Sequence, residues 1–586
     1  MTMGRAPRAL NVRLIVIGAI LVLGWVPIGI RLFSIQALAS GEHDYAELGL
    51  QQRSRVELLA ADRGTIFDRH GVELAVSVGT TTVYANPGHI ADAAAVAREL
   101  APVLGMELGE LEERLTRDSG YVVLMRSAEN RDAALIRDVV DDRRLPGIYF
   151  IGETRRFYPA GQLASQVIGF VQTDDNSGLE GLELTFDEVL AGTPGELVEE
   201  RDPQGRRIPQ AEYRYIAAEP GADIVTTLDP VIQFAAEQAL GDAMEATGAT
   251  GGAVVVLEVG TGGILAMANA PTFDPNDRSD TSPEAYRNRA VTDRYEPGST
   301  LKVVTLAGAL NEGVLRETEL LEVPMELEVD RGENKDPKVY RDVARHPLEM
   351  SVADIVAQSS NVGTILIQSR LGNELHYDYL RAFGLGSAAS GDFTGESNGW
   401  LEPVEDWCSS TCGPSTAIGY RVDATVLQMA AVFGAIANDG VWVQPHIVTE
   451  VIDAAGSHTV DPVVRPVVSE ETARVLRELL AGVVERGTGT SAAVTGYSVA
   501  GKTGTTEKWL PEEGRYSEDD RFASFIGMVP ARTPRLVVAV MLDSPNGDTD
   551  AGLDQRFGGV SAAPVFAQVA EAALHQLGVP PDGVGP

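Results

Sequence analysis

The longest apolar run in the chain lies near its N-terminus. Residues 14–30 carry no charged side chain, and a helix of this run spans roughly 26 Å at 1.5 Å per residue. That length predicts a membrane-spanning helix over residues 14–36. A cleaved signal peptide, with Ala37-Leu38-Ala39 as the cleavage site, and a buried core helix are the alternatives.

The charges that flank this run differ in sign. Basic residues precede it and acidic residues follow it: Arg5, Arg8 and Arg13, then Glu42, Asp44 and Glu47. The positive-inside rule therefore predicts that residues 1–13 are cytoplasmic and that the rest of the chain lies outside. No second run approaches eighteen apolar residues, so we expect a single-pass protein of the cell membrane.

Two folded regions are expected after this segment. Residues 37–215 mix helical patterns, over 91–116 and 128–142, with short strands and glycine turns, which indicates an irregular α+β domain. Residues 200–222 are polar and rich in Pro and Gly, so they form the candidate boundary. A second domain is expected over 222–577, followed by a Gly/Pro-rich flexible tail at 578–586.

The second region has clear element signals. Asp229-Pro230 is a well-formed helix start, and the apolar runs 253–259 and 264–269 around a glycine turn predict a β-hairpin. Residues 536–542 read as a buried strand and 562–574 as a helix that packs on it. We therefore expect a multidomain α+β or α/β protein whose C-terminal domain is an antiparallel sheet flanked by helices.

Composition narrows the possible functions. The 586 residues are 44% hydrophobic and 22% charged, as in folded proteins, and the formal net charge of −37 disfavours nucleic acid as a partner. The chain has two cysteines and eight histidines without the spacing of metal ligands. No metal and no cofactor is therefore expected.

The candidate chemistry begins at Ser299. Pro297-Gly298 predicts a turn, and the apolar stretch after it predicts a helix, so Ser299 lies at a helix start with Lys302 one turn further on the same face. A serine hydroxyl needs a neighbouring base to become a nucleophile. A buried lysine can supply that base, because burial lowers its pKa and favours the free amine.

Two further strings follow in order. They are Ser359-Ser360-Asn361 and Lys502-Thr503-Gly504-Thr505. With Ser299-x-x-Lys302 they match the S-x-x-K, S-D-N and K-T-G signature of penicillin-binding proteins and class A β-lactamases, with Ser360 in the place of Asp. On a strand, Thr503 and Thr505 point to one face, so both hydroxyls can address one carboxylate.

In these residues the sequence resembles the class B penicillin-binding proteins, the peptidoglycan transpeptidases with one membrane anchor. The resemblance covers nearly the whole chain. Residues 63–71 and 158–183 look like the two motif blocks of the family's pedestal or dimerisation domain, and 268–302, 525–527 and 558–566 look like parts of its transpeptidase domain. Glu-Pro-Gly before Ser299 and the Ser-x-Asn motif resemble the division branch more than the elongation branch.

The resemblance implies roles for these residues. Ser299 would be the acylated nucleophile, Lys302 its general base, and Ser359 a proton relay to the departing D-alanine. Asn361 would bind the substrate amide, and Lys502 would add positive potential. Thr503, Gly504 and Thr505 would form the carboxylate and oxyanion site, with the backbone N–H groups of Ser299 and Thr505 as oxyanion donors.

The function that follows is cross-linking of stem peptides that end in D-Ala-D-Ala, with an amine as acceptor, during septal wall synthesis. β-Lactams would be inhibitors, and a membrane glycosyltransferase and other division proteins would be partners. A hydrolase on the same scaffold, either a carboxypeptidase or a β-lactamase, is one alternative. A non-catalytic β-lactam receptor or division scaffold is the other.

Three other features are predicted to be structural. Cys408 and Cys412 either form a small loop disulfide or stay as free thiols. Asp342 and His346 are expected to form a surface ion pair rather than to line the substrate cleft. The acidic residues 512–520 are expected in a solvated loop.

Overall fold

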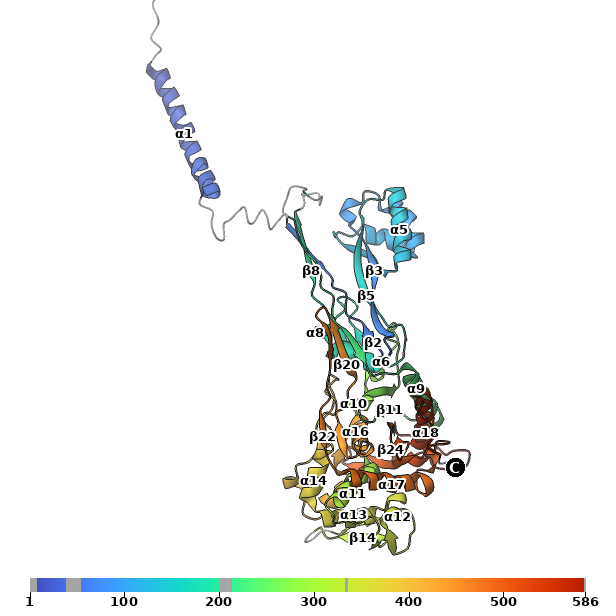
Figure 1. The fold of residues 1–586 in the computed structure, drawn as a ribbon. Helices are drawn as coiled ribbons and strands as arrows, with labels where there is room; N and C mark the ends of the chain where they lie inside the picture. The colour runs from blue at the N-terminus through green and yellow to red at the C-terminus, as the bar shows by residue number, and fades with distance from the viewer. Residues whose placement is uncertain (1–7, 38–53, 201–207, 209–212, 332–335, 584–586) are drawn as a thin grey trace, which may run out of the picture. The chain divides into compact units, whose positions relative to one another are not determined.

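The computed structural model describes residues 8–37, 54–200, 208, 213–331 and 336–583 (Figure 1). Several residues named above lie outside the described ranges: Arg5, Leu38 and Ala39, the acidic residues after the anchor, and residues 201–207 and 209–212 of the boundary segment. The chain divides into two compact units. The first is Met1–Ala61 with Thr193–Glu219, and the second is Asp62–Gly192 with Pro220–Pro586.

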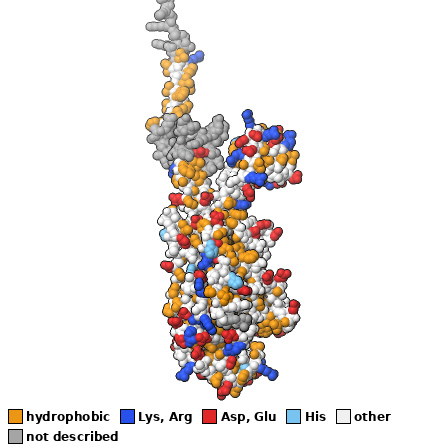
Figure 2. All heavy atoms as spheres, turned by 45° about the vertical axis from the view of Figure 1, so that its right-hand side comes forward, with side chains coloured by type: hydrophobic (Ala, Val, Ile, Leu, Met, Phe, Trp, Pro, Cys, Tyr) orange, Lys and Arg blue, Asp and Glu red, His pale blue; other side chains and the backbone are white. Residues whose placement is uncertain are grey.

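The first unit contains the apolar helix α1, Arg8–Ala37. Within it, Val12–Phe33 forms a 22-residue span with a mean hydropathy of 2.2, and none of its most apolar window is buried (Figure 2). The absence of burial argues against a core helix and is consistent with a membrane anchor. This unit also holds an antiparallel sheet in the order β1 (Ser54–Leu59), β8 (Gly195–Glu200) and β9 (Tyr213–Ile216).

The second unit begins with a seven-stranded sheet in the order β21-β20-β10-β2-β3-β4, with β5 also paired to β3. Its strands are β2 (Ile66–Phe67), β3 (Glu73–Ala85), β4 (Val122–Ala128), β5 (Ile148–Phe157), β10 (Asp223–Thr226), β20 (Val448–Asp453) and β21 (Gly456–Thr459). Strands from both sides of the predicted boundary near Ala222 therefore share one sheet. The domain limits remain a prediction.

Helices pack on the outer part of this sheet around their own apolar core. They are α3 (Ala93–Leu104), α4 (Leu108–Leu115) and α5 (Asn130–Arg143). The helical pattern at 91–116 is thus two helices, because Gly105 adopts a left-handed conformation, with φ of 65°, and ends the first. The smaller elements that follow are α6 (Ser165–Ile168), β6 (Phe170–Val171), β7 (Gly178–Glu180), α7 (Gly181–Thr185) and α8 (Asp187–Leu190).

A buried ionic cluster joins the two motif blocks of this region. Arg63 donates through Nε to Glu183 Oε2, and Arg156 donates through Nε to Glu183 Oε1, each at 2.6 Å. All three side chains are at most 2% exposed. Since removing one partner from a buried ion pair leaves the other charge without compensation, the cluster ties the two motif blocks together.

The C-terminal part is built on a five-stranded antiparallel sheet in the order β12-β11-β25-β24-β23. The strands are β11 (Gly251–Glu258), β12 (Ile264–Ala270), β23 (Ala500–Leu510), β24 (Arg515–Val529) and β25 (Leu536–Asp543). Along β25, Val538 and Val540 enter one core while Ala539 and Met541 enter another. Both faces are therefore covered, which explains the continuous apolar run at 536–542.

Helices α9 (Pro230–Thr247) and α18 (Gly558–Gln576) cover one face of this sheet and α16 (Val426–Ala437) the other. Asp229 caps α9 by accepting hydrogen bonds from the N–H groups of Val231 and Ile232, as its sequence predicts. The predicted hairpin β11–β12 is also confirmed. The fold is mixed α/β, in agreement with the predicted class.

A helical subdomain lies beside β23. Its helices are α11 (Lys302–Asn311), α12 (Val352–Ala357), α13 (Asn361–Leu371), α14 (Asn373–Ala382), α15 (Cys412–Ala417) and α17 (Glu470–Arg486). Short strand pairs complete it: β13 (Leu320–Glu322) with β16 (Glu349–Ser351), β14 (Glu326–Val329) with β15 (Lys338–Arg341), β17 (Trp400–Leu401) with β18 (Val422–Asp423), and β19 (Val441–Val443) with β22 (Val464–Pro466).

The acidic residues after the third motif are exposed, as expected, but they do not form a loop. Glu512 and Glu513 occupy the turn between β23 and β24, whereas residues 518–520 lie within β24. The two strands continue as a hairpin beyond the body of the sheet, since Leu510 still pairs with Arg515. The expectation of a solvated loop is therefore wrong for residues 518–520.

Candidate active site

Ser299 lies in a single 3-10 turn, Gly298–Thr300, directly before α11. Gly298 has φ of 55°, and a Cβ atom there would lie 2.4 Å from Thr506 Cγ2 on β23, so only glycine fits between the turn and the strand. The N–H of Gly298 donates to Gly419 O at 3.1 Å. Ser299 is thus fixed at a helix start, partly exposed, as its sequence predicts.

Lys302 is 2% exposed and donates to atoms of the second motif. Its Nζ lies 2.7 Å from Ser359 O, 2.7 Å from Asn361 Oδ1 and 3.3 Å from Ser359 Oγ. Among the described residues, no hydrogen bond links Lys302 to Ser299. Burial lowers the pKa of Lys302 to about 7, and the negative charge of Asp342 opposes that shift.

The second motif turns sharply between α12 and α13. Ser359 has φ of 59°, a left-handed conformation that is uncommon outside glycine. Both its carbonyl and its hydroxyl oxygen accept hydrogen bonds from Lys302. Ser360 is the N-cap of α13 and accepts from the N–H of Gly363 at 2.8 Å, so a serine here serves as a cap.

Asp342, which directly follows β15, accepts hydrogen bonds from three groups of this motif and the residue after it. Its Oδ1 accepts from the N–H groups of Asn361 at 2.5 Å and Val362 at 3.1 Å. Its Oδ2 accepts from Ser360 Oγ at 2.6 Å and lies 2.9 Å from His346 Nε2. The Asp342 and His346 side chains are 3% and 1% exposed, so the expectation of a surface ion pair is wrong.

The third motif reaches the same serine. Lys502, on β23, is 2% exposed and donates through Nζ to Ser359 Oγ at 2.8 Å and to Thr503 O at 3.2 Å. Burial, together with the positive charge of Lys302, places the pKa of Lys502 well below its ordinary value. Two buried amines, from the first and third motifs, therefore meet at the hydroxyl of the second.

The remaining residues of the third motif lie on the same strand. Thr503 Oγ1 is 2.6 Å from Thr488 Oγ1, and Thr505 Oγ1 accepts from the N–H of Gly558 at the start of α18 at 3.1 Å. A Cβ atom at Gly504 would lie 2.4 Å from Ser524 Oγ. β23 is the edge strand of the five-stranded sheet, so its outer backbone groups are not used in that sheet.

Cys408 and Cys412 are joined in a disulfide with a Cα–Cα distance of 5.3 Å. Cys412 begins α15, which leads to Gly419 and so to the turn that carries Ser299. The bridge braces a loop and contains no atom of the three motifs.

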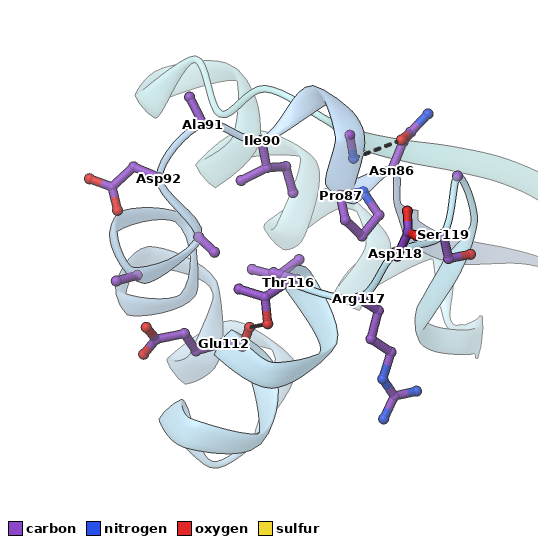
Figure 3. Close-up of a pocket in the computed structure, with 15 residues that line it drawn as sticks. Asn86, Pro87, Ile90, Ala91, Asp92, Glu112, Thr116, Arg117, Asp118 and Ser119 are labelled. Carbon is purple, nitrogen blue, oxygen red and sulfur yellow. Dashed lines mark hydrogen bonds between the residues drawn. The ribbon is translucent and has the colours of Figure 1, made fainter.

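A cavity lies away from the three motifs. It measures about 880 Å³ and is formed by residues 86–94 and 112–120 at the helical end of the seven-stranded sheet (Figure 3). Its lining includes Asp92, Glu112 and Asp118 and no residue of the three motifs.

Comparisons with known families agree with this geometry. Residues 252–571 match the penicillin binding protein transpeptidase domain, and residues 58–226 match the penicillin-binding protein dimerisation domain. The chain belongs to the class B penicillin-binding proteins. The three motifs all lie within the transpeptidase match.

Similar proteins align with this penicillin-binding protein over nearly its whole length. The probable peptidoglycan D,D-transpeptidase PenA of Neisseria meningitidis is 34% identical, with 91% of this chain and 88% of that one covered. The peptidoglycan D,D-transpeptidase FtsI of Escherichia coli is 32% identical, covering 90% and 86%. Penicillin binding protein 3 of Mycobacterium tuberculosis, solved with aztreonam, has 30% identity and a TM-score of 0.69, covering 90% and 98%.

Proposed function

We propose that this penicillin-binding protein is a peptidoglycan D,D-transpeptidase that forms an acyl-enzyme at Ser299. The observation that carries the proposal is the meeting of Lys302 and Lys502 at Ser359 Oγ, at 3.3 and 2.8 Å, beside the turn that presents Ser299. Burial lowers the pKa of both amines, and the charge of Lys302 lowers that of Lys502 further. A neutral amine can accept a proton at neutral pH.

The reaction follows from these groups. Ser299 Oγ attacks the carbonyl carbon of the penultimate D-alanine while its proton passes to the free amine of Lys302. The C–N bond to the terminal D-alanine then breaks, and the leaving nitrogen takes a proton through the Ser359 hydroxyl. An acceptor amine attacks the resulting ester, loses a proton to the same amine–hydroxyl chain, and releases Ser299 as a hydroxyl.

The substrate is held from β23. Lys502 provides positive potential for the terminal carboxylate, and Thr503 and Thr505 provide hydroxyl groups on one strand face. The backbone N–H groups of Ser299 and Thr505 form the oxyanion hole, and Asn361 binds the substrate amide. A preorganised oxyanion donor contributes about 2.7–4 kcal/mol to transition-state stabilisation.

The cellular setting is part of the proposal. Residues 1–13 lie in the cytoplasm, α1 anchors the chain, and the catalytic domain works outside the membrane in septal synthesis with a membrane glycosyltransferase. The basic residues that precede the apolar run of α1 and the relatives FtsI and PenA support this setting. β-Lactams acylate Ser299, as the penicillin binding protein 3 structures with aztreonam and ampicillin suggest by analogy.

Fluorescent-penicillin labelling and intact mass test the proposal. We expect a long-lived adduct on the wild type and on Ser369→Ala, which removes an exposed serine of α13, and no adduct on Ser299→Ala. Rapid loss of the adduct would identify a hydrolase instead. Full restoration of septation by Ser299→Ala in a depleted strain would favour a non-catalytic receptor or scaffold.

A further inference from the structure

Hydrogen bonds connect the second motif to a lysine outside the three motifs. Asn361 donates through Nδ2 to Arg341 O at 3.0 Å, which places β15 beside the motif. At the other end of this short strand, Lys338 donates through Nζ to Ser415 Oγ at 3.1 Å, on α15. Lys338 itself is exposed to solvent.

The connection continues from α15 to the nucleophile. Gly419 follows α15 and accepts from the N–H of Gly298, next to Ser299, at 3.1 Å. Tyr420 comes next in the chain, and the N–H of Arg421 donates to Glu296 Oε1 at 2.7 Å. Lys338 and Glu296 therefore contact the same segment, α15 and the turn after it, and each charge acts on the pKa of the other.

Glu296 has an unused hydrogen-bond acceptor. Its Oε1 also accepts from Tyr516 O–H at 3.1 Å, and its backbone carbonyl accepts from Thr506 Oγ1 at 2.8 Å. Its Oε2 is buried and, within the described part of the chain, has no hydrogen-bond partner. Because an unpaired buried carboxylate oxygen is costly, a ligand that donates to Oε2 would remove that cost.

Aromatic rings lie next to Glu296, beginning with Tyr516, whose O–H bonds to Oε1. Tyr420 and Tyr516 pack edge to face with ring centroids 5.7 Å apart, and Trp509 packs on Tyr516 at 5.0 Å. Trp509 is 50% exposed, so the group reaches the surface. Aromatic faces beside a carboxylate form a site suited to an ammonium group, which both the rings and the charge attract.

Lys338 adds a positive group to this negative one. Partial burial of its ammonium, with Arg331 and Arg421, lowers the pKa of Lys338, while Glu296 opposes that shift. Burial likewise raises the pKa of Glu296, and Lys338 is among the groups that oppose it. The guanidinium of Arg421 pairs with Glu402. The Lys338 ammonium has three N–H donors and uses one for Ser415, so the others can bind a carboxylate.

We propose that Glu296 and Lys338 bind the zwitterionic end of the third residue of a stem peptide, its ammonium at Glu296 and its carboxylate at Lys338. The inference rests on the proposed function, because it assigns a substrate class to the same site. It selects stem peptides whose third side chain ends in both charges, as in meso-diaminopimelate, over those with lysine. The group can belong to the donor or to the acceptor strand.

The test compares synthetic stem peptides on the full chain in detergent. Donors that end in D-Ala-D-Ala carry meso-diaminopimelate, its side-chain amide or L-lysine at the third position, and intact mass follows acylation of Ser299. A second arm forms the acyl-enzyme from a short thioester and measures its partition between water and acceptor peptides with the same three residues. The arm that discriminates identifies the strand.

Loss of one charge-assisted contact corresponds to about a tenfold to a hundredfold preference for meso-diaminopimelate. We expect Lys338→Met to reduce this preference to about threefold or less. Glu296→Gln should slow all three peptides alike, because each keeps the ammonium, and Glu245→Gln, an exposed residue of α9, should change neither the rates nor the preference. Equal rates in the wild type on both arms, a preference that survives Lys338→Met, or unchanged rates in Glu296→Gln would overturn the inference. Absence of any acylation at Ser299 would instead overturn the proposed function.

Discussion

Asp342→Asn is the most informative single substitution, because Asp342 supports the second motif without belonging to it. Its carboxylate contacts Ser360 Oγ, His346 Nε2 and the N–H groups of Asn361 and Val362 within 2.5–3.1 Å. Asparagine keeps an acceptor for the two backbone groups but loses the charge. Breaking a buried, charged network of this kind costs about 3–5 kcal/mol, which a protein with 5–15 kcal/mol of stability survives.

The same substitution has an electrostatic effect of known sign. The Asp342 carboxylate holds the pKa of Lys302 up, against burial that lowers it to about 7. Without that charge, the protonated amine is less stable and the pKa of Lys302 falls further. The acid limb of the acylation rate should therefore move to lower pH in Asp342→Asn, even though the maximal rate falls because Asn361 and Lys302 are less firmly held.

Stopped-flow acylation by a fluorescent penicillin, from about pH 5 to about pH 9, measures this limb, and chemical denaturation measures the stability. Asp378→Asn, an exposed aspartate of α14, is the matched control and should change neither. If the limb stays in place or moves to higher pH while stability drops, Asp342 acts only as a structural cap and the electrostatic reasoning is wrong.

Three further predictions concern the same domain. The acylation rate of the wild type should rise with pH through an apparent pKa of about 7 as Lys302 loses its proton. In Lys302→Arg the rate should fall at least about a hundredfold at every pH. A wild-type rate that rises only near pH 10 would argue against Lys302 as the base. Gly504→Ala places Cβ 2.4 Å from Ser524 Oγ, so titration with penicillin should show acylation at least about tenfold slower. Reduction of Cys408–Cys412 opens a loop with a sequence separation of 4 and should lower the free energy of unfolding by about 2 kcal/mol; in Cys408→Ser the reductant should have no effect.

Local signals predicted much of the fold. Asp229-Pro230 marks the start of α9 because a cap and a proline act within one turn, and the run at 536–542 marks a strand because both of its faces are buried. The Pro297-Gly298 turn before an apolar stretch likewise placed Ser299 at a helix start. Each of these depends on residues that are neighbours in the chain.

What the sequence missed depends on distant contacts. Asp342 and His346 are four residues apart, a spacing typical of an exposed helix pair, and nothing local indicates that the first caps α13. Lys302 was expected to address Ser299, but its amine points to Ser359 because α12 and α13 bring that turn over it. The spacing of residues along the chain predicts which side chains lie on one face of an element. Tertiary packing decides which other residues that face contacts.

The pairing of β10 with β2 has a practical consequence for anyone who wishes to study catalysis on a shortened protein. Ile224 and Val225 of β10 are hydrogen-bonded in register with Ile66 and Phe67, more than a hundred and fifty positions earlier in the chain. A truncated polypeptide that starts at Ala222 would leave that side of β10 with unpaired amides and carbonyls. Such an exposed strand edge can pair with another copy of the chain and cause aggregation. A truncated protein should therefore begin no later than Asp62, so that β10 of the catalytic half keeps its pairing with β2.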